Sequence, residues 1–375
     1  MKQYQDLLQN ILDNGREKES GRVNMPNTIG LSRGTILMEN VEENFPLLTT
    51  KKMFWKGIVH ELLWFLRGET NIKYLVDNNV NIWNGDAYRW YLKWWEESGR
   101  HLGGLRKLET IEEFIEQVKQ DSNPVYPWKG HGHGNHQILD LMKGEHLGGY
   151  VMGDLGKVYG YQWRNQNGVD QIKDIYEELK KNPYGRYKIL DAWNKRDFPE
   201  MALPPCHLLY QFIVRPMTAS EREDWYAEKH RFTADQRWEM NPNATDEDVH
   251  KLMDFEDVPR YFLDLNMYQR SCDTFLGVPF NLASMSLLLL IMAKAVGMVA
   301  GDAFWIGGDT HVYVDHIPVV KEQISREPLE LPKVEINKEL NSLEDILSLT
   351  VDDFELVNYK SHDKLTAELF TGLKK

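Results

Sequence analysis

The sequence has 375 residues, 42% of them hydrophobic and 27% charged, so the chain is long and apolar enough to bury a sizeable core. Its formal net charge of −13 argues against a nucleic-acid-binding surface, because phosphate binding needs clustered Lys and Arg. Two cysteines cannot form a disulfide framework, and the longest wholly apolar run, Leu287 to Ala293, is far shorter than the ~20 residues of a membrane span. The composition therefore predicts a soluble, cytoplasmic protein that binds neither nucleic acid nor membranes.

Helical spacing of apolar residues predicts two helices near the N-terminus. The first contains Tyr4, Leu8 and Ile11 and ends at Asn14-Gly15. The second covers 54–67 and ends at Gly68. Glu61 lies inside this second, apolar helix, where a carboxylate is either exposed on the outer face or buried for a functional reason.

Two segments have the composition of insertions, at about 84–150 and 217–260. The first is rich in Trp, Gly and charged residues, contains one amphipathic helix near Ile111 to Val118, and includes a His-rich loop at 129–136. We interpret this loop as solvated rather than metal-binding, because it lacks a rigid scaffold and a Cys or carboxylate partner. The second insertion carries twelve acidic and five basic residues within 220–257. Its helix-start patterns, Ser220-x-x-Glu223 and Thr245-x-x-Asp248, predict a helical excursion on the surface.

The rest of the chain alternates between helical and strand patterns. Further helices are predicted at 169–183 and, as an apolar core element, at 282–297. Strands are predicted at 186–193, 205–215 and 261–269. This order indicates one α+β domain over 1–375 with a large mixed or mainly antiparallel sheet.

Several polar residues stand out from these elements. Cys206 follows two prolines and precedes His207, so it is either a nucleophile held on a rigid backbone or a small core residue, whereas Cys272 is expected to face the core. Asn281 is either a helix N-cap or a group that recognises an amide-like ring edge. His311 and Tyr313 fall on one strand face, as a buried pair or as a site for sugar hydroxyls.

Seven segments, in the same order, resemble the thymidylate synthase family and span almost the whole chain outside the two insertions. They are FPLLTTKK (45–52), HELLWFLRGETNI (60–72), GDLGKVYGYQWR (153–164), DAWN (191–194), MALPPCH (201–207), YQRSCDTFLGVPFN (268–281) and GGDTHVY (307–313). The resemblance implies a homodimer built around a large sheet. It also implies transfer of a one-carbon unit from 5,10-methylenetetrahydrofolate to C5 of dUMP, without a metal.

The resemblance also assigns roles to individual residues. Cys206 would attack C6 of the ring as a thiolate whose pKa is lowered by Arg270. Glu61 would relay protons with a raised pKa, and Tyr159 would assist removal of the C5 proton. His207 and Asn281 would complete the polar network around O4 of the base.

The remaining roles concern substrate and folate. The phosphate of dUMP would be bound by Arg22, Arg270, Ser271 and, from the partner subunit, Arg186. His311 and Tyr313 would hold the deoxyribose. On the folate side the resemblance implies Lys51, Trp83 and Asp273.

The sequence also departs from the family pattern. Tyr187 replaces the usual second arginine, Met285 replaces a tyrosine, and Asp86 replaces a tryptophan on the folate side. The C-terminus ends in Gly372-Leu-Lys-Lys375 rather than in a short apolar tail. A loosely closed tail admits water, so the sequence favours a deoxyuridylate hydroxymethylase that forms 5-hydroxymethyl-dUMP. The alternatives are a thymidylate synthase that forms dTMP and a noncatalytic binding protein on the same scaffold.

Overall fold

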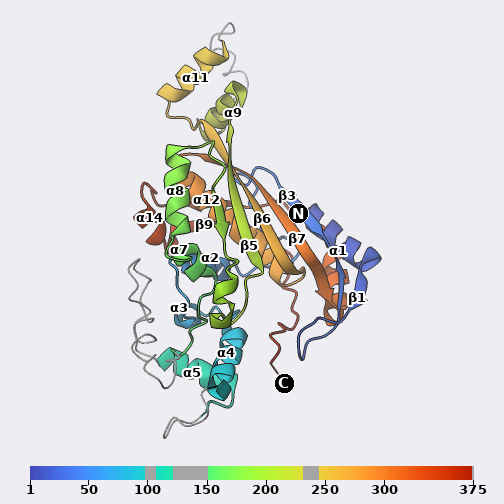
Figure 1. Cartoon of the computed structure of the whole chain (residues 1–375). Helices are drawn as coiled ribbons and strands as arrows, with labels where there is room; N and C mark the ends of the chain where they lie inside the picture. The colour runs from blue at the N-terminus through green and yellow to red at the C-terminus, as the bar shows by residue number, and fades with distance from the viewer. Residues whose placement is uncertain (98–106, 121–150, 231–244, 374–375) are drawn as a thin grey trace.

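A computed structural model of the chain describes residues 1–97, 107–120, 151–230 and 245–373. Within these residues one sheet of seven strands forms the centre of the molecule, in the order β1-β2-β7-β6-β5-β4, with β3 also paired to β7 (Figure 1). The strands are β1 (Arg16–Lys18), β2 (Thr28–Leu31), β3 (Gly34–Met38), β4 (Ile189–Asp191), β5 (His207–Pro216), β6 (Tyr261–Asp273) and β7 (Val299–Tyr313). Strands β6 and β7 run parallel and the other pairs are antiparallel, which confirms the predicted mixed α+β sheet.

Helix α12 (Gly277–Ala295) packs against β6 and β7 and forms the centre of the core. By length and composition it could cross a membrane, but 83% of its apolar window is buried inside the protein, as in a core helix. The helix begins earlier than the sequence predicted. Asp273 Oδ1 accepts hydrogen bonds from the backbone N–H groups of Phe275 and Leu276, which forms the turn into the helix. Asn281 therefore lies inside the helix, and its interpretation as an N-cap is wrong.

The remaining helices surround this core, and two expected near the N-terminus, α1 (Lys2–Asn14) and α2 (Trp55–Leu66), are confirmed. The predicted helix at 169–183 is α8 (Gln171–Lys181). A small second sheet pairs β8 with β9. The other elements are α3 (Lys73–Asp77), α7 (Tyr159–Asn165), α13 (Ile317–Ser325), β8 (Lys333–Ile336), α14 (Leu343–Leu347) and β9 (Phe354–Val357), with short 3-10 turns at Lys195–Glu200, Val314–His316 and Val351–Asp353.

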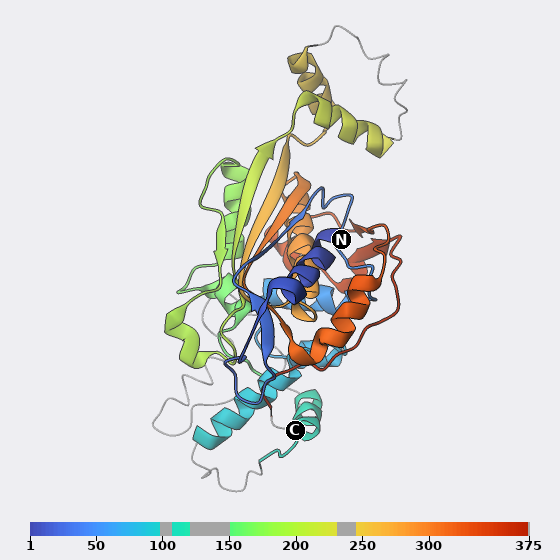
Figure 2. The ribbon, with the colours of Figure 1, turned by 90° about the vertical axis from the view of Figure 1, so that its right-hand side faces the viewer.

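The two insertions lie at opposite ends of the molecule (Figures 1 and 2). The first contributes the predicted helix, α5 (Ile111–Gln120), and also α4 (Asn84–Glu97), which the sequence analysis missed. The buried face of α4 is made of Gly85, Ala87, Tyr88 and Tyr91, so its apolar signal was hidden among aromatic and polar residues. The His-rich loop at 129–136 lies outside the described residues.

The second insertion forms an arm of two helices, α9 (Ala219–His230) and α11 (Asp246–Phe255), that projects beyond the sheet (Figures 1 and 2). The predicted capping box at Thr245 and Asp248 is confirmed. The one predicted at Ser220 is wrong: Thr218 and Glu221 exchange these hydrogen bonds instead.

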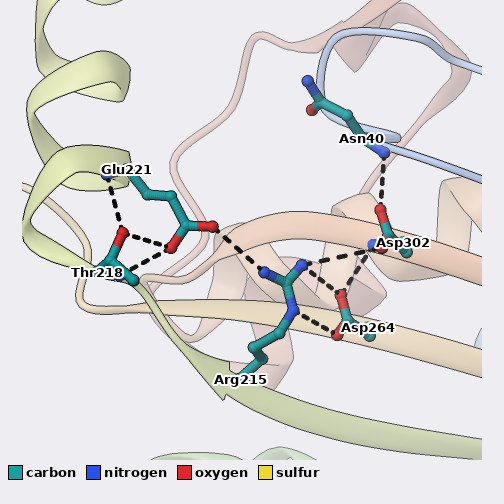
Figure 3. A network of polar contacts seen from close by, with 6 residues as sticks. All are labelled: Asn40, Arg215, Thr218, Glu221, Asp264 and Asp302. Atoms are coloured by element: carbon teal, nitrogen blue, oxygen red, sulfur yellow. Dashed lines mark hydrogen bonds and ion pairs between the residues drawn. The ribbon is translucent and has the colours of Figure 1, made fainter.

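Arg215 connects the arm to the end of the sheet (Figure 3). Its guanidinium contacts Asp264 Oδ2 at 3.1 Å and Glu221 Oε1 at 3.7 Å. Asp264 in turn accepts the backbone N–H of Asp302 at 2.8 Å. The carboxylate of Glu221 thus caps the arm and faces the arginine of β5.

The sheet face opposite α12 carries apolar side chains that are open to solvent in the single chain. Leu37, Ile189, Ile213 and Tyr268 are each 40–42% exposed. The strand register places them on one face. Ile189 pairs with Gln211, Gln211 with Asn266, Asn266 with Phe304 and Phe304 with Leu37, and Ile213 and Tyr268 each lie two residues from a member of this row. Exposed apolar groups gathered on a sheet face are typical of a surface that another protein covers.

Candidate active site

A cavity of about 390 Å³ lies where β5, β6 and β7 meet α2, α4 and the C-terminal segment. Most of the site residues predicted from the sequence line it. They are Arg22, Glu61, Trp83, Tyr159, Cys206, His207, Ser271, Asp273, Asn281, His311 and Tyr313. The fold thus gathers residues that are up to about three hundred positions apart into one pocket.

Cys206 is held at the mouth of β5 by its backbone. Its N–H donates to the Tyr159 hydroxyl at 2.6 Å, and its carbonyl accepts from the backbone N–H of Arg270 at 2.8 Å. The Arg270 side chain donates to the carbonyls of Pro205 and Pro204 at 2.8 and 2.9 Å, which places Nη2 3.9 Å from Cys206 Sγ. The two prolines thus position the arginine as well as the cysteine.

The electrostatics of Cys206 differ from the expectation of a lowered pKa. Burial raises the pKa of the thiol, and the charges of Arg270 and Arg22 oppose this shift without reversing it. The reason is desolvation, because the stabilisation lost when a buried thiolate leaves water is larger than the stabilisation that the two arginines supply. Cys272 is fully buried and faces the core, as predicted.

Glu61 reaches the pocket from α2. The indole Nε1 of Trp83 donates to its Oε1 at 2.8 Å, so the two residues fix each other's orientation. Burial raises the pKa of Glu61 to about 7, and the hydrogen bond from Trp83 only partly opposes this. The expected raised pKa is confirmed, and the group exchanges its proton near neutral pH.

Asn281 faces the pocket with its orientation fixed by a chain of hydrogen bonds. The indole of Trp305, which is only a donor, donates to Gln269 Oε1 at 2.9 Å. Gln269 must then present Nε2, which donates to Asn281 Oδ1 at 3.0 Å. The Asn281 amide nitrogen is therefore left as the group that offers hydrogen bonds to a ligand.

His207 stacks on Tyr159, with ring centroids 4.2 Å apart, and its Nδ1 contacts the Tyr210 hydroxyl at 2.8 Å. Burial lowers the pKa of His207 to about 3, so the imidazole is neutral at physiological pH. It is a hydrogen-bonding group of the pocket floor rather than a cation.

Three predicted residues are not among those that line the cavity: Lys51, Arg186 and Arg270, whose Nη2 lies 3.9 Å from Cys206 Sγ. Lys51 is buried beside the cavity, where Nζ donates to the Phe275 carbonyl at 2.5 Å, and burial lowers its pKa to about 7. Arg186 is exposed on the loop before β4. The role of Lys51 in binding folate and the role of Arg186 in binding the phosphate in the partner's site both remain predictions.

The C-terminal segment contributes residues that the sequence analysis did not anticipate. Ala367, Leu369 and Phe370 line the cavity. The Phe370 ring stacks on the His316 ring, with centroids 5.1 Å apart, and contacts the Tyr313 ring edge-on, with centroids 4.9 Å apart. Although the chain ends in two lysines, residues shortly before them line the site, so the tail lies against the pocket and not away from it.

Comparison with known proteins shows which family the chain belongs to. A model of the thymidylate synthase family matches residues 2–371. The chain belongs to the thymidylate synthase family. Its thymidylate synthase relatives include that of Malacoplasma penetrans, 38% identical over 98% of this chain and 99% of the relative. Those of Mesoplasma florum and Mycoplasma pneumoniae are each 36% identical over the same shares. The family is one of folate-dependent methyltransferases.

The shifted pKa of Glu61 predicts a pH-dependent stability. Between the unfolded pKa of about 4.3 and the folded value near 7, the folded state keeps a proton that the unfolded state releases, so stability falls as pH rises. Glu61→Gln is neutral at every pH and should gain on the order of 2 kcal/mol over the unsubstituted protein between pH 5 and pH 8. Urea unfolding at both pH values measures this gain. Glu177→Gln, at an exposed position of α8, is the control, and parallel pH curves for Glu61→Gln and the unsubstituted protein would contradict the prediction.

Proposed function

We propose that this protein is a thymidylate synthase that converts dUMP to dTMP with 5,10-methylenetetrahydrofolate as the one-carbon donor. The observation that carries the proposal is the C-terminal segment packed over the pocket, because a closed, dry site favours hydride transfer over capture by water. The relatives described above are named thymidylate synthases, which supports the proposal. Hydroxymethylation, which the sequence favoured, depended on an open tail and loses that support.

The chemistry begins with Cys206 as nucleophile. Its Sγ adds to C6 of the uracil ring, which makes C5 electron-rich enough to attack the one-carbon unit. Arg270 and Arg22 favour the thiolate and partly offset the cost of its burial. Arg22 and Ser271, with Arg186 from the partner subunit, bind the phosphate, and His311 and Tyr313 bind the deoxyribose.

Glu61 and Tyr159 take part in the proton transfers to the folate nitrogen and from C5. Glu61, with a pKa near 7, donates a proton as the one-carbon unit leaves its folate nitrogen and serves as the proton relay for C5. Tyr159, held by Cys206 N–H, orders the water that takes the C5 proton. Neutral His207 hydrogen-bonds through this water network toward O4.

The apolar side of the pocket suits the folate. Ile82, Trp83, Leu276, Phe280 and Phe370 provide a surface on which a flat heterocycle can stack, and Asp273 offers a carboxylate to its ring nitrogens. The folate supplies the methylene carbon and then a hydride, and it leaves as dihydrofolate. The residues around it exclude water while Cys206 is expelled from C6.

The product assay tests this proposal. Protein incubated with dUMP and methylenetetrahydrofolate should form dTMP and dihydrofolate in equal amounts, followed by dihydrofolate absorbance and nucleotide mass. Cys206→Ala should abolish turnover, because no other thiol faces C6, whereas Cys272→Ala should retain it as the matched control. A nucleotide heavier than dTMP by one oxygen, without dihydrofolate, would mean hydroxymethylation. Full activity of Cys206→Ala would exclude the covalent mechanism.

Base selection is predicted from the orientation of Asn281. Its amide nitrogen donates to O4 of uracil, whereas the 4-amino group of cytosine would place two donors against each other. Asn281→Asp replaces this donor with an acceptor and should move the ratio of kcat/KM for dCMP over dUMP upward by at least tenfold. Asn337→Asp, at an exposed position after β8, is a control for the added charge. An unsubstituted protein that prefers dCMP would contradict this account.

The uncovered sheet face supports a homodimer as the active unit. Two copies packed through Leu37, Ile189, Ile213 and Tyr268 would bury the apolar face opposite α12. Arg186, which lies outside its own chain's cavity next to β4, would then reach the site of the partner.

Hybrid complementation tests this assembly. Mixing inactive Arg186→Ala and Cys206→Ala proteins should restore up to about a quarter of normal activity, because random exchange gives half hybrids and each hybrid has one intact site. Mass spectrometry of isotopically labelled subunits verifies the exchange. The absence of recovery after verified exchange would place Arg186 outside the shared site.

A further inference from the structure

Arg89, on α4 of the first insertion, binds the C-terminal segment. Its Nη1 donates to the Thr371 carbonyl at 2.5 Å. Its Nη2 donates to Asp86 Oδ1 at 2.5 Å and to the Ala202 carbonyl at 3.2 Å, on the segment that leads to Cys206. One guanidinium thus joins three separate parts of the chain around the pocket.

Asp86 orients this guanidinium. It lies in the first turn of α4, three residues before Arg89, and lines the cavity. Its side chain is only 13% exposed and Arg89 is 29% exposed, so their ion pair is partly shielded from water. A charge-assisted hydrogen bond in such a setting is stronger than one at the surface, and it fixes the plane of the guanidinium toward Thr371.

The surface under the tail is shaped to receive it. A Cβ added at Gly85 would lie 2.6 Å from Thr371 Cγ2 and 2.9 Å from Thr371 Cβ, so the tail rests directly on the glycine. On its other side the tail is held by the contact of His316 Nε2 with the Glu368 carbonyl at 3.0 Å and by the stacking of Phe370 on His316. Asn24 Nδ2 also donates to the Gly372 carbonyl at 3.3 Å. The closed position is therefore set by contacts on both flanks.

We propose that Asp86 and Arg89 form a latch that holds the C-terminal segment over the active site, and that this latch determines whether the one-carbon intermediate is reduced or hydrated. The inference rests on the proposed function, because it concerns the fate of the exocyclic methylene on C5. With the tail closed, a hydride from tetrahydrofolate adds to the methylene, the Cys206–C6 bond breaks, and dTMP and dihydrofolate form. With the tail released, water adds to the same carbon, the Cys206–C6 bond breaks, a proton is lost, and 5-hydroxymethyl-dUMP and tetrahydrofolate form.

Both residues are positioning residues, since they act through the tail and not on the reacting atoms. Their location also gives the described part of the first insertion a role. Helix α4 brings Asp86 to the cavity wall and places Gly85 and Arg89 against Thr371 of the C-terminal segment, and α5 packs on α4. The insertion thus supplies one side of the closure.

Two substitutions release the tail by different physical means. Arg89→Ala removes the three hydrogen bonds of the guanidinium. Gly85→Ala leaves Arg89 intact and favours the helix, but its methyl group displaces Thr371. Arg89→Lys keeps the charge without the planar fork and should restore only part of the closure. Arg215→Ala is the control, because it breaks another arginine–carboxylate cluster at the arm, away from the cavity (Figure 3).

The experiment compares product ratios and tail accessibility in the full-length protein. Arg89→Ala and Gly85→Ala should both raise the ratio of 5-hydroxymethyl-dUMP to dTMP and raise KM for methylenetetrahydrofolate on the order of tenfold. Calorimetric dUMP affinity should stay within about twofold in Gly85→Ala, which leaves the hydrogen bond from Arg89 to the Ala202 carbonyl in place. Trypsin cleavage at exposed Lys364 should quicken in both variants and remain unchanged in Arg215→Ala.

The outcomes separate the latch from the proposed function. Unchanged product ratios in both variants, with normal dUMP binding, would overturn the latch. If Arg89→Ala does not fold, Arg89→Lys decides the question, because it keeps the charge and removes the planar fork that binds both Asp86 and Thr371. If the unsubstituted protein forms no dTMP, the proposed function fails. In that case unchanged trypsin cleavage in both variants would overturn the latch as well, and faster cleavage would support the latch as a contact that holds the tail.

Discussion

The parallel pairing of β6 with β7 is the constraint on which the pocket depends. Its register sets Ser271 beside Asp309 and Asp273 beside His311, so two segments far apart in sequence end at the same edge of the sheet. The start of β5 joins them through the pairing of His207 with Gln269, which brings Cys206 to that edge. A slip of one residue by either strand would turn the pocket side chains of that strand to the opposite face.

The charges at this edge of the sheet favour an anionic ligand. The chain has a net charge of −13, so a phosphate ester meets an unfavourable long-range field. The guanidinium of Arg270 is held in place by the carbonyls of Pro204 and Pro205, which leaves its charge uncompensated by a carboxylate among its described contacts. Burial of Glu61 has a related effect, since a carboxyl group with a pKa near 7 removes much of one negative charge from the pocket at neutral pH. The local field is thereby more favourable to an anion than the net charge suggests.

Much of this arrangement could be predicted from the sequence where local pattern decides. The spacing of apolar residues predicted α2 and the core position of α12. The placement of Glu61 in an apolar helix left its burial open, and its raised pKa was expected from the role that the family resemblance implied. Properties that depend on distant parts of the chain could not be predicted in this way. Asn281 was interpreted as an N-cap, but the turn into the helix is formed by Asp273, eight residues earlier in the sequence. The raised pKa of Cys206 comes from rings of other elements that exclude water around the thiol.

The C-terminal segment shows why interpreting each sequence position by itself led to a wrong expectation about the folate site. Asp86 and the extended tail, each considered alone, indicated a wetter and looser folate site. In the folded chain they belong to one contact, because Asp86 orients Arg89 and Arg89 binds the backbone of Thr371. A backbone carbonyl carries no side-chain identity, so no sequence pattern at Thr371 announces this bond. Two departures from a family pattern that lie far apart in the sequence are therefore better interpreted together once their distance in space is known.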